Sequence, residues 1–383
     1  MDSRNEAYDW KWSAARQFLP FDLDGLAVDT GALVRRRCVD GGEALVRLLL
    51  LVGLPKASLE RAARLAREAG LAAMSAPALF KRLARAEKLL TALFLHTLRF
   101  SVDVGERWGK RRLLAVDATA LCGPGATGTD QRLHTVYDLN KGLPLSVELT
   151  DSHGGEALWR HHLFGPGDLV LADSGYGYNN SFLWALNAGA SILVRFNFQT
   201  VKLYDEQGER IWADAIDATL PDSGTAEVKV TLPGWSKPLR AIGARNPKGE
   251  PVWLLTDLSA EDLPISQVRE LYRKRWQVEL YFKRLKSLVD LDELPTRDGP
   301  TARPWIWAKL VLASLAVLLS HERFSPWGHI EEETAQPLEA RGIRHDGADA
   351  SAARTGLPKK TRKAQRETKT RREARPSIYS VEA

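Results

Sequence analysis

The feature that most constrains this chain is a series of short apolar and alternating segments that begins at residue 112. The apolar run RLLAVDATAL is followed by two alternating segments, at 132–140 and 143–152, which the turn sequence Asn-Lys-Gly separates. Alternation with a period of two is typical of half-buried strands, and a short polar turn between two of them forms a hairpin. These residues therefore predict three consecutive strands with antiparallel pairing.

Helices and strands alternate in the next part of the chain. A helical stretch over 155–164 precedes an apolar strand that ends at Asp173, and a helix over 180–190 precedes another strand over 191–198. Parallel strands need a helix-sized connection between them, so this order favours parallel pairing. We therefore expect an α/β fold with one mixed sheet, antiparallel in its first half and parallel in its second, flanked by helices.

The regions on either side of these strands differ in character. Residues 1–105 are predicted to be all helical, and the stretches 58–71 and 75–94, joined by a short turn, resemble a helix-turn-helix. Any helical bundle gives the same pattern, so DNA recognition here is one of two interpretations. Residues 199–257 contain short β-like runs separated by Gly and Pro, which predicts a β-rich insertion.

The positive charge of the chain is concentrated. The net charge is +6, but the stretch from Arg354 to Arg375 has ten Lys or Arg against two Glu, and the remaining chain is slightly acidic. An anionic partner must therefore be bound by local clusters such as Arg35–Arg37. The tail over 335–383 has few large apolar residues, which predicts a basic, disordered segment.

Cysteine content and apolar segments indicate the compartment. Cys38 and Cys122 are too few for a disulfide framework or a structural zinc site. The chain opens on polar residues without the apolar core of a secretion signal, and the apolar runs 48–54 and 309–320 are too short to span a bilayer. These features favour a cytoplasmic protein without a membrane partner.

One carboxylate is prominent in the helix predicted over residues 272–288. That stretch has six Lys or Arg and a single acidic residue, Glu279. At about 100° per residue, Tyr272, Arg275 and Lys286 share a strip about 60° wide with Glu279, beside an apolar strip. A solvated basic helix with one ordinary salt bridge gives the same pattern, so a functional role for Glu279 requires partners elsewhere.

Two aspartates are predicted to be those partners. Asp117 is predicted at the end of the first strand and Asp173 at the end of the fourth, and pairing of these strands would bring both carboxylates to one edge of the sheet. Carboxylate oxygens suit Mg²⁺ and Mn²⁺, and two such ions can promote a phosphodiester displacement. Other acidic residues near strand ends are alternatives by position alone: Asp138, Asp151 and Asp257.

These residues resemble a known family. Tyr272, Arg275, Glu279 and Lys286 match Y-x2-R-x3-E-x6-K, the helix motif of DDE transposases of the insertion-sequence-4 type. The segments AVDAT and LADSGYG look like the contexts of that family's two aspartates, and the similarity covers roughly residues 30–330. The resemblance implies a ribonuclease H-like core with a β-rich insertion before the helix that carries the glutamate.

The resemblance also implies a reaction and its participants. The implied reaction is cleavage at the ends of an insertion sequence, through a hairpin, followed by strand transfer into target DNA. The two ends would be paired by a homodimer in the cytoplasm, on the nucleoid. The implied ligands of two Mg²⁺ ions, which Mn²⁺ can replace, are Asp117, Asp173 and Glu279. The implied contacts to phosphates near the transposon end are Tyr272, Arg275 and Lys286.

The domain boundaries implied are a helical DNA-binding domain over 1–105, a catalytic domain over 106–334 and the tail. Ser174 departs from the family, since many relatives have Arg there, and residues after about 330 carry no resemblance.

Two other functions stay open: a catalytically inactive DNA-binding protein derived from a transposase, and a metal-dependent nuclease without strand transfer. Three tryptophans of the insertion could each be core residues or stack on an unpaired base, with the last most expected in the core: Trp212, Trp235 and Trp253.

Overall fold

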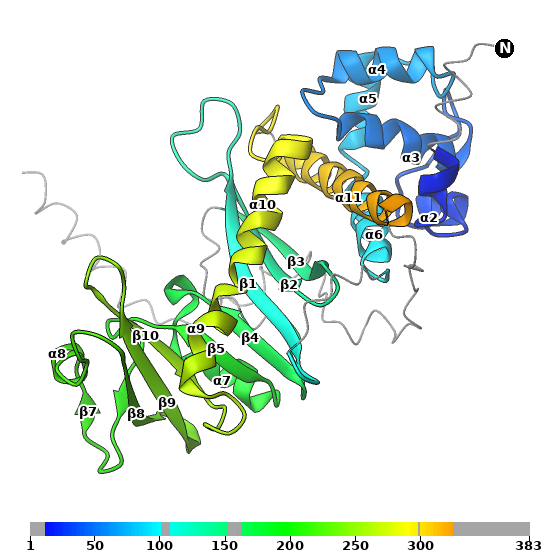
Figure 1. Ribbon diagram of the computed structural model, residues 1–383. Helices are drawn as coiled ribbons and strands as arrows, with labels where there is room; N and C mark the ends of the chain where they lie inside the picture. Colours follow the sequence, from blue (N-terminus) through cyan, green and yellow to red (C-terminus); the bar gives the residue numbers. More distant parts are fainter. Residues whose placement is uncertain (1–11, 101–107, 152–158, 160–161, 298, 325–383) are drawn as a thin grey trace, which may run out of the picture. The chain divides into compact units, whose positions relative to one another are not determined.

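The computed structural model describes residues 12–100, 108–151, 159, 162–297 and 299–324 (Figure 1). The predicted tail over 335–383 lies outside these residues, and so does most of the helix predicted over 155–164.

The described strands form one mixed sheet in the order β3-β2-β1-β4-β5-β10-β9-β8-β6-β7. β1, β2 and β3 pair antiparallel, whereas β1, β4 and β5 pair parallel, which confirms the predicted α/β class and the change of pairing along the sheet. The first five strands are β1 (Arg112–Leu121), β2 (Gln131–Asp138), β3 (Leu143–Asp151), β4 (Asp168–Ala172) and β5 (Ser191–Arg195).

The first strand is longer than predicted. Asp117 lies within β1, so the prediction that this strand ends at Asp117 is wrong. β2 pairs with β1 as far as Leu121 opposite Gln131, and this ladder keeps the chain extended beyond the apolar run. Pairing with a neighbouring strand can keep polar residues in a strand. The hydropathy of β1 alone could not predict this, because the neighbouring strand is a different segment of the chain.

The insertion is β-rich, as predicted, and it continues the core sheet. β10 pairs antiparallel with β5, so the inserted strands extend the same sheet past its parallel part. Its elements are β6 (Leu203–Tyr204), β7 (Arg210–Ile211), α8 (Ala213–Asp217), β8 (Thr225–Leu232), β9 (Trp235–Arg245) and β10 (Pro251–Thr256).

Helices cover both faces of the core strands (Figure 1). On one face, Leu113 and Ala115 of β1 belong to a buried cluster with α10 (Trp276–Val289). On the other face, Leu114 and Val116 belong to a second cluster with α7 (Asn179–Asn187). Successive residues of a strand point to opposite faces, so both clusters follow from the apolar composition of β1.

The N-terminal part is helical, as predicted, but its core includes a helix from the far end of the described chain. Trp305 of α11 (Gly299–Phe324) donates from Nε1 to the carbonyl of Val52 at 2.8 Å, and a Cβ on Gly53 would lie 2.8 Å from the carbonyl oxygen of Ala308. The other helices are α2 (Leu23–Asp29), α3 (Gly41–Val52), α4 (Leu59–Glu68), α5 (Ala76–Leu83) and α6 (Glu87–Thr97). The helices of the segment 1–105 therefore complete their packing with α11.

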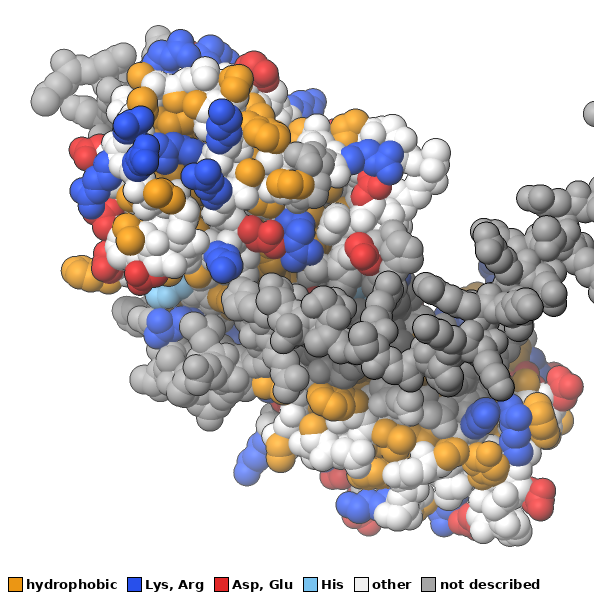
Figure 2. Space-filling model, turned by 180° about the vertical axis from the view of Figure 1, so that it is seen from behind, with side chains coloured by type: hydrophobic (Ala, Val, Ile, Leu, Met, Phe, Trp, Pro, Cys, Tyr) orange, Lys and Arg blue, Asp and Glu red, His pale blue; other side chains and the backbone are white. Residues whose placement is uncertain are grey.

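Two details of these helices bear on function. Residues 69–75 join α4 to α5, which is longer than the three- or four-residue turn of a standard helix-turn-helix. Figure 2 shows Lys and Arg side chains gathered over this helical part, where α4 exposes Arg61, Arg64 and Arg67. The helices therefore present a basic surface whether or not they form that motif.

One described helix is long and apolar enough to cross a membrane, over Pro300–Ser320 in α11. The apolar run 309–320 is thus part of a longer helix than predicted, and its length alone does not exclude a span. However, most of this apolar segment is buried inside the protein, because the helix packs in the N-terminal core.

Candidate active site

The sheet places the two predicted aspartates side by side. β1 and β4 are parallel with Val116 opposite Ala172, so the next residues along each strand, Asp117 and Asp173, are neighbours. Leu113, Ala115, Leu169 and Leu171 all belong to the cluster on the α10 side of the sheet. By alternation, both carboxylates are placed on that side.

A half-buried ion pair supports the register that aligns these aspartates. Arg112 donates from Nε and Nη2 to the two carboxylate oxygens of Asp168 at 2.7 and 3.0 Å, and these two residues are themselves register partners at the start of β1 and β4. A slip of one residue would turn Asp117 to the other face of the sheet. The pair therefore opposes such a slip from five residues away.

Each aspartate is also held by its own loop or strand. Asp117 Oδ1 accepts a hydrogen bond from the N–H of Ala118 at 2.8 Å. Asp173 Oδ1 accepts one from the N–H of Gly175 at 2.9 Å, as the N-cap of a short 3₁₀ turn after β4. The backbone thus orients both carboxylates, and this arrangement leaves one oxygen of each for another partner.

The helix predicted over 272–288 is broken, so its prediction as one continuous element is wrong. α9 (Ile265–Arg273) ends before α10 begins, and the N–H groups of Lys274 and Arg275 donate three residues back instead of four. No residue between Leu271 and Val278 is fully buried, so core packing holds this stretch in regular helix only weakly. The helix propensities of these residues predicted one continuous helix, because propensity does not account for tertiary packing.

The break brings Arg275 onto two carboxylates. Arg275 is the N-cap residue of α10, and Glu279 lies in the first turn. Arg275 Nη2 donates to Glu279 Oε1 at 2.6 Å, and Nη1 donates to Asp117 Oδ2 at 3.5 Å. The structure thus joins the first strand to α10 through one guanidinium, which the sequence had placed among the contacts to phosphate.

The other two predicted DNA contacts lie at different distances from this centre. Tyr272, on α9, donates its hydroxyl to the carbonyl of Ala172 at 3.3 Å, directly before Asp173. Burial raises the pKa of Tyr272 to about 12, so the phenol stays protonated. Lys286 lies two turns beyond Glu279 along α10, roughly 10 Å along the helix axis.

The electrostatics of the site favour a cation. The pKa of Asp117 is raised to about 6, mainly by burial and also by the carboxylates of Asp173 and Glu279, while the Ala118 N–H and Arg275 oppose the rise. Three interacting carboxylates offer the hard oxygen ligands that Mg²⁺ and Mn²⁺ prefer, so the donor set fits such ions. Among the described residues, no three Asp, Glu, His or Cys side chains are close enough to hold a metal ion as they stand.

The alternative acidic residues are engaged elsewhere. Asp257 accepts from the N–H of Ile192 at 2.7 Å, beside the start of β5 and hence at the opposite edge of the parallel strands from Asp173. Asp138 is fully buried and accepts from the N–H groups of Asn140 and Lys141 in the β2–β3 turn. Asp151 is the exposed last residue of β3. Their positions favour structural roles for Asp138 and Asp257.

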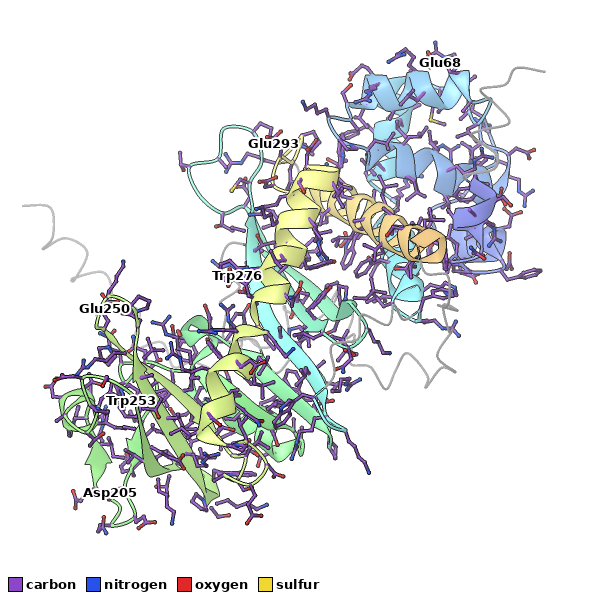
Figure 3. The ribbon with its side chains drawn as sticks, viewed as in Figure 1. Glu68, Asp205, Glu250, Trp253, Trp276 and Glu293 are labelled. Atoms are coloured by element: carbon purple, nitrogen blue, oxygen red, sulfur yellow. The ribbon has the colours of Figure 1, made fainter. Side chains whose placement is uncertain are left out.

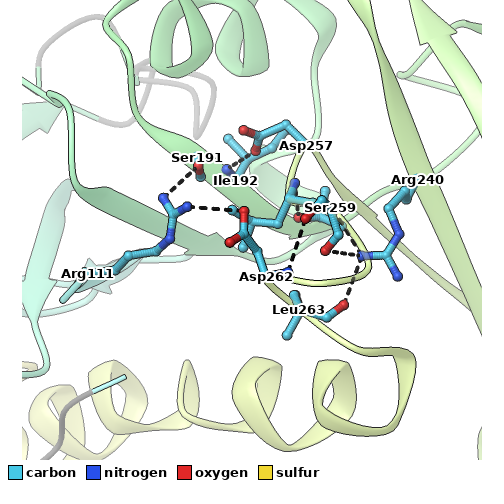
Figure 4. A network of polar contacts seen from close by, with 10 residues as sticks. Arg111, Ser191, Ile192, Arg240, Asp257, Ser259, Asp262 and Leu263 are labelled. Carbon is cyan, nitrogen blue, oxygen red and sulfur yellow. Dashed lines mark hydrogen bonds and ion pairs between the residues drawn. The ribbon is translucent and has the colours of Figure 1, made fainter. Parts of the chain in front are cut away.

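A second buried arginine holds the linker that leads to α9 (Figure 4). Arg240 of β9 donates from Nη1 to the carbonyls of Leu258, Ser259 and Leu263 at 2.9–3.0 Å. Its Nε and Nη2 atoms donate to Glu227 at 2.7 and 2.8 Å. Sequence reasoning missed this residue, because an arginine in an alternating strand looks like a solvated side chain.

The structure separates the tryptophans of the insertion. Trp253 is buried against Gly243 and donates to Asp217 at 2.7 Å, so it is a core residue, as expected. Trp235 is half-buried, whereas Trp212 is 58% exposed with the Arg210 guanidinium 3.9 Å from its ring centre. Figure 3 shows Trp276 on α10, a further exposed aromatic that sequence reasoning had passed over.

Comparisons with known proteins agree with this geometry. A family model described as the Transposase DDE domain matches residues 108–315. The putative transposase InsL of insertion sequence element IS186A from Escherichia coli K12 is 31% identical over 349 residues, which covers 81% of this chain and 94% of that protein. The transposase for insertion sequence element IS421 from Escherichia coli is also 31% identical, over 350 residues, with the same coverage of 81% and 94%.

A solved structure supports the fold independently. The piggyBac transposase, in a synaptic complex with hairpin DNA, is similar with a TM-score of 0.51 at 12% sequence identity, which covers 84% of this chain and 77% of that one. This likeness agrees with the predicted ribonuclease H-like core. The family match over more than half the chain and the nearly full-length relatives together show that the chain belongs to the DDE transposases of the insertion-sequence-4 type.

Proposed function

We propose that this transposase cleaves DNA at the ends of its insertion sequence and joins those ends to target DNA. In this proposal Asp117, Asp173 and Glu279 bind two divalent cations, Mg²⁺ or Mn²⁺. The observation that carries it is the register of β1 and β4, which aligns two aspartates on the face of the sheet where the helix of Glu279 packs. The bridge from Arg275 to Asp117 and Glu279 supports their convergence.

The protein's own residues supply rigidity and position. Bound divalent cations would promote attack by water or a DNA hydroxyl and stabilise the leaving oxygen. Asp117 lies within β1 and Asp173 directly follows β4, so regular strands hold both positions more firmly than a long loop would. Lys286 would donate to a phosphate from its ammonium group, and Tyr272 would donate to another in exchange for the carbonyl of Ala172.

The basic helical part is proposed to bind the element's ends. Its exposed arginines on α4 and the Arg35–Arg37 loop can contact phosphates, which position a duplex without reading its sequence. Arg82 of α5 donates to the carbonyl of Arg37 at 2.6 Å and so holds that loop against the helices. Two ends must meet before strand transfer, so we propose a homodimer that acts in the cytoplasm, on the nucleoid.

The test is a cleavage and joining assay with the intact chain. Purified protein and Mg²⁺ are incubated with a duplex that carries the inverted repeats, and gels resolve nicks, hairpins and joined products. D117N, D173N and E279Q should each reduce products to background and leave DNA binding unchanged. R284Q, which removes an exposed charge from the same α10 helix, is the matched control.

Different outcomes distinguish the alternatives. Normal cleavage by E279Q would reject the assignment of Glu279 to the site. Nicked products without joined products would favour a metal-dependent nuclease over a transposase that completes strand transfer. Binding without any cleavage would favour a DNA-binding protein that has lost catalysis.

A further inference from the structure

Arg275 is an incompletely satisfied buried cation. Only 13% of its side chain is exposed, and it donates to Glu279 at 2.6 Å and to Asp117 at 3.5 Å. Its guanidinium also lies 5.9 Å from the ring centre of Tyr272. Its buried Nε atom has no hydrogen-bond partner. A guanidinium has five N–H donors, and buried donors are nearly always paired in folded proteins. The hydrogen bonds of Arg275 therefore leave one donor unpaired, which is unusual for an arginine with a purely structural role.

The oxygens that Arg275 contacts are those proposed to bind divalent cations. A cation would approach a carboxylate oxygen to about 2.0–2.1 Å in the case of Mg²⁺. With the guanidinium 2.6 Å from Glu279 Oε1, the two positive groups would lie in direct contact in a partly buried place, where repulsion is strong. Arg275 and a divalent cation therefore compete for Asp117 and Glu279.

A phosphate offers Arg275 a better-matched partner. The planar guanidinium binds phosphate through two parallel hydrogen bonds, a geometry that its single contact to each carboxylate does not use. Arg275 lies at the N-terminal end of α10, and the next residue, Trp276, is 57% exposed, so this end of the helix lies at the surface. A bound strand can therefore reach the guanidinium by a change of side-chain rotamer.

We propose that Arg275 couples DNA binding to cation binding. In the free protein it pairs with Asp117 and Glu279. When DNA binds, it transfers to a phosphate and releases both carboxylates for the divalent cations. This inference rests on the proposed function. Because binding free energies are linked, DNA must raise the affinity for the cation by the same factor by which the cation raises the affinity for DNA.

The test measures Mn²⁺ affinity, which needs no catalysis. Free Mn²⁺ is counted by electron paramagnetic resonance in titrations of the intact wild-type chain and the variants R275Q, R275K and R284Q. Without DNA, R275Q should bind Mn²⁺ about tenfold more tightly than wild type, within the roughly 5- to 150-fold range of such couplings. R275K should have an intermediate Mn²⁺ affinity, because lysine keeps the positive charge and lacks the planar guanidinium donors. R284Q, an exposed site on the same helix, should match wild type.

The same Mn²⁺ titrations are then repeated with a saturating amount of duplex that carries the terminal inverted repeat. Wild type should then gain about tenfold in Mn²⁺ affinity, and R275Q should gain nothing further. Equal Mn²⁺ affinity of wild type and R275Q without DNA, with both folded by circular dichroism, would overturn the coupling. R275K provides a second comparison if R275Q does not fold. E279Q separates the two proposals: if it binds Mn²⁺ as wild type does, the proposed metal site itself fails, whatever Arg275 does.

Discussion

Two buried arginines in this protein have opposite relations to their surroundings. Arg240 uses all three guanidinium nitrogens, with Glu227 on one side and three linker carbonyls on the other. Arg275 makes one short and one long contact with carboxylates, lies 5.9 Å from the ring centre of Tyr272, and leaves Nε without a hydrogen-bond partner. Buried donors in folded proteins are nearly always paired, so the unpaired Nε of Arg275 requires an explanation that the fully paired Arg240 does not.

The carboxylates beside these arginines show the same difference. The hydrogen bonds from Arg240 hold the pKa of Glu227 below its usual value, so that carboxylate is stabilised as an anion. Burial raises the pKa of Asp117 to about 6 despite the presence of Arg275. The fold therefore stabilises the Glu227 carboxylate as an anion and disfavours the anionic form of Asp117, as expected where function opposes stability.

The largest expected effect comes from removing the satisfied arginine. R240M should lower the free energy of unfolding by about 3 kcal/mol, because it leaves buried linker carbonyls without donors and Glu227 without its partner. Urea denaturation of the intact chain measures this loss. R245M removes an arginine from the same strand, whose contacts to Gly249 and Leu220 are more exposed, and should cost less than about 1 kcal/mol. An equal loss of unfolding free energy in R240M and R245M would contradict the structural role assigned to Arg240.

Removing the incompletely satisfied arginine should have a smaller effect that depends on the cation. R275M in the presence of a chelator should lower the free energy of unfolding by about 1 kcal/mol, because Asp117 and Glu279 are partly exposed and can be rehydrated. Added Mn²⁺ should restore or exceed the wild-type stability of R275M, by mass action on the folded state. Mn²⁺ should not rescue R240M. Thermal unfolding with and without Mn²⁺ compares the two variants directly.

The smallest effect is a dependence of the Arg240–Glu227 pair on pH. Because the folded-state pKa of Glu227 lies below its usual 4.5, the pair's contribution is fully present above about that pH. It is lost as the pH falls through the lower folded value. E227Q should therefore be less stable than wild type at pH 7, and the difference should shrink below pH 4.5 in urea denaturation series. A difference that stays constant down to pH 3 would contradict the role assigned to this carboxylate.

Sequence patterns predicted the elements that depend on local properties. Apolar runs predicted the strands that lead to Asp117 and Asp173, and the motif contexts selected these residues over Asp138 and Asp257, whose positions alone had left the choice open. The break of the helix at Lys274 could not be predicted, because it depends on tertiary packing, which leaves no residue of the following turn fully buried. Arg240 was missed for a related reason, since its partners lie 13–23 residues away in the chain.

The packing of α11 in the N-terminal core was also beyond local patterns. Trp305 and Val52 are 253 residues apart, and no periodicity within either segment reports their contact. The apolar runs at both ends predicted buried helices, but not that they are buried against each other. Contacts of this kind were therefore the main part of the fold left to the structure.

That same packing has a consequence for how the protein is made. The N-terminal helices are synthesised first, yet α11 leaves the ribosome about 10 to 50 s later, at 5–20 residues per second across the 253 residues that separate Val52 from Trp305. During that interval their apolar faces need other cover, such as a chaperone. A premature stop codon anywhere in the insertion would release a chain whose basic helices cannot complete their core. Shortened copies of the gene would therefore yield degraded chains, with little capacity to occupy DNA ends in competition with the intact enzyme.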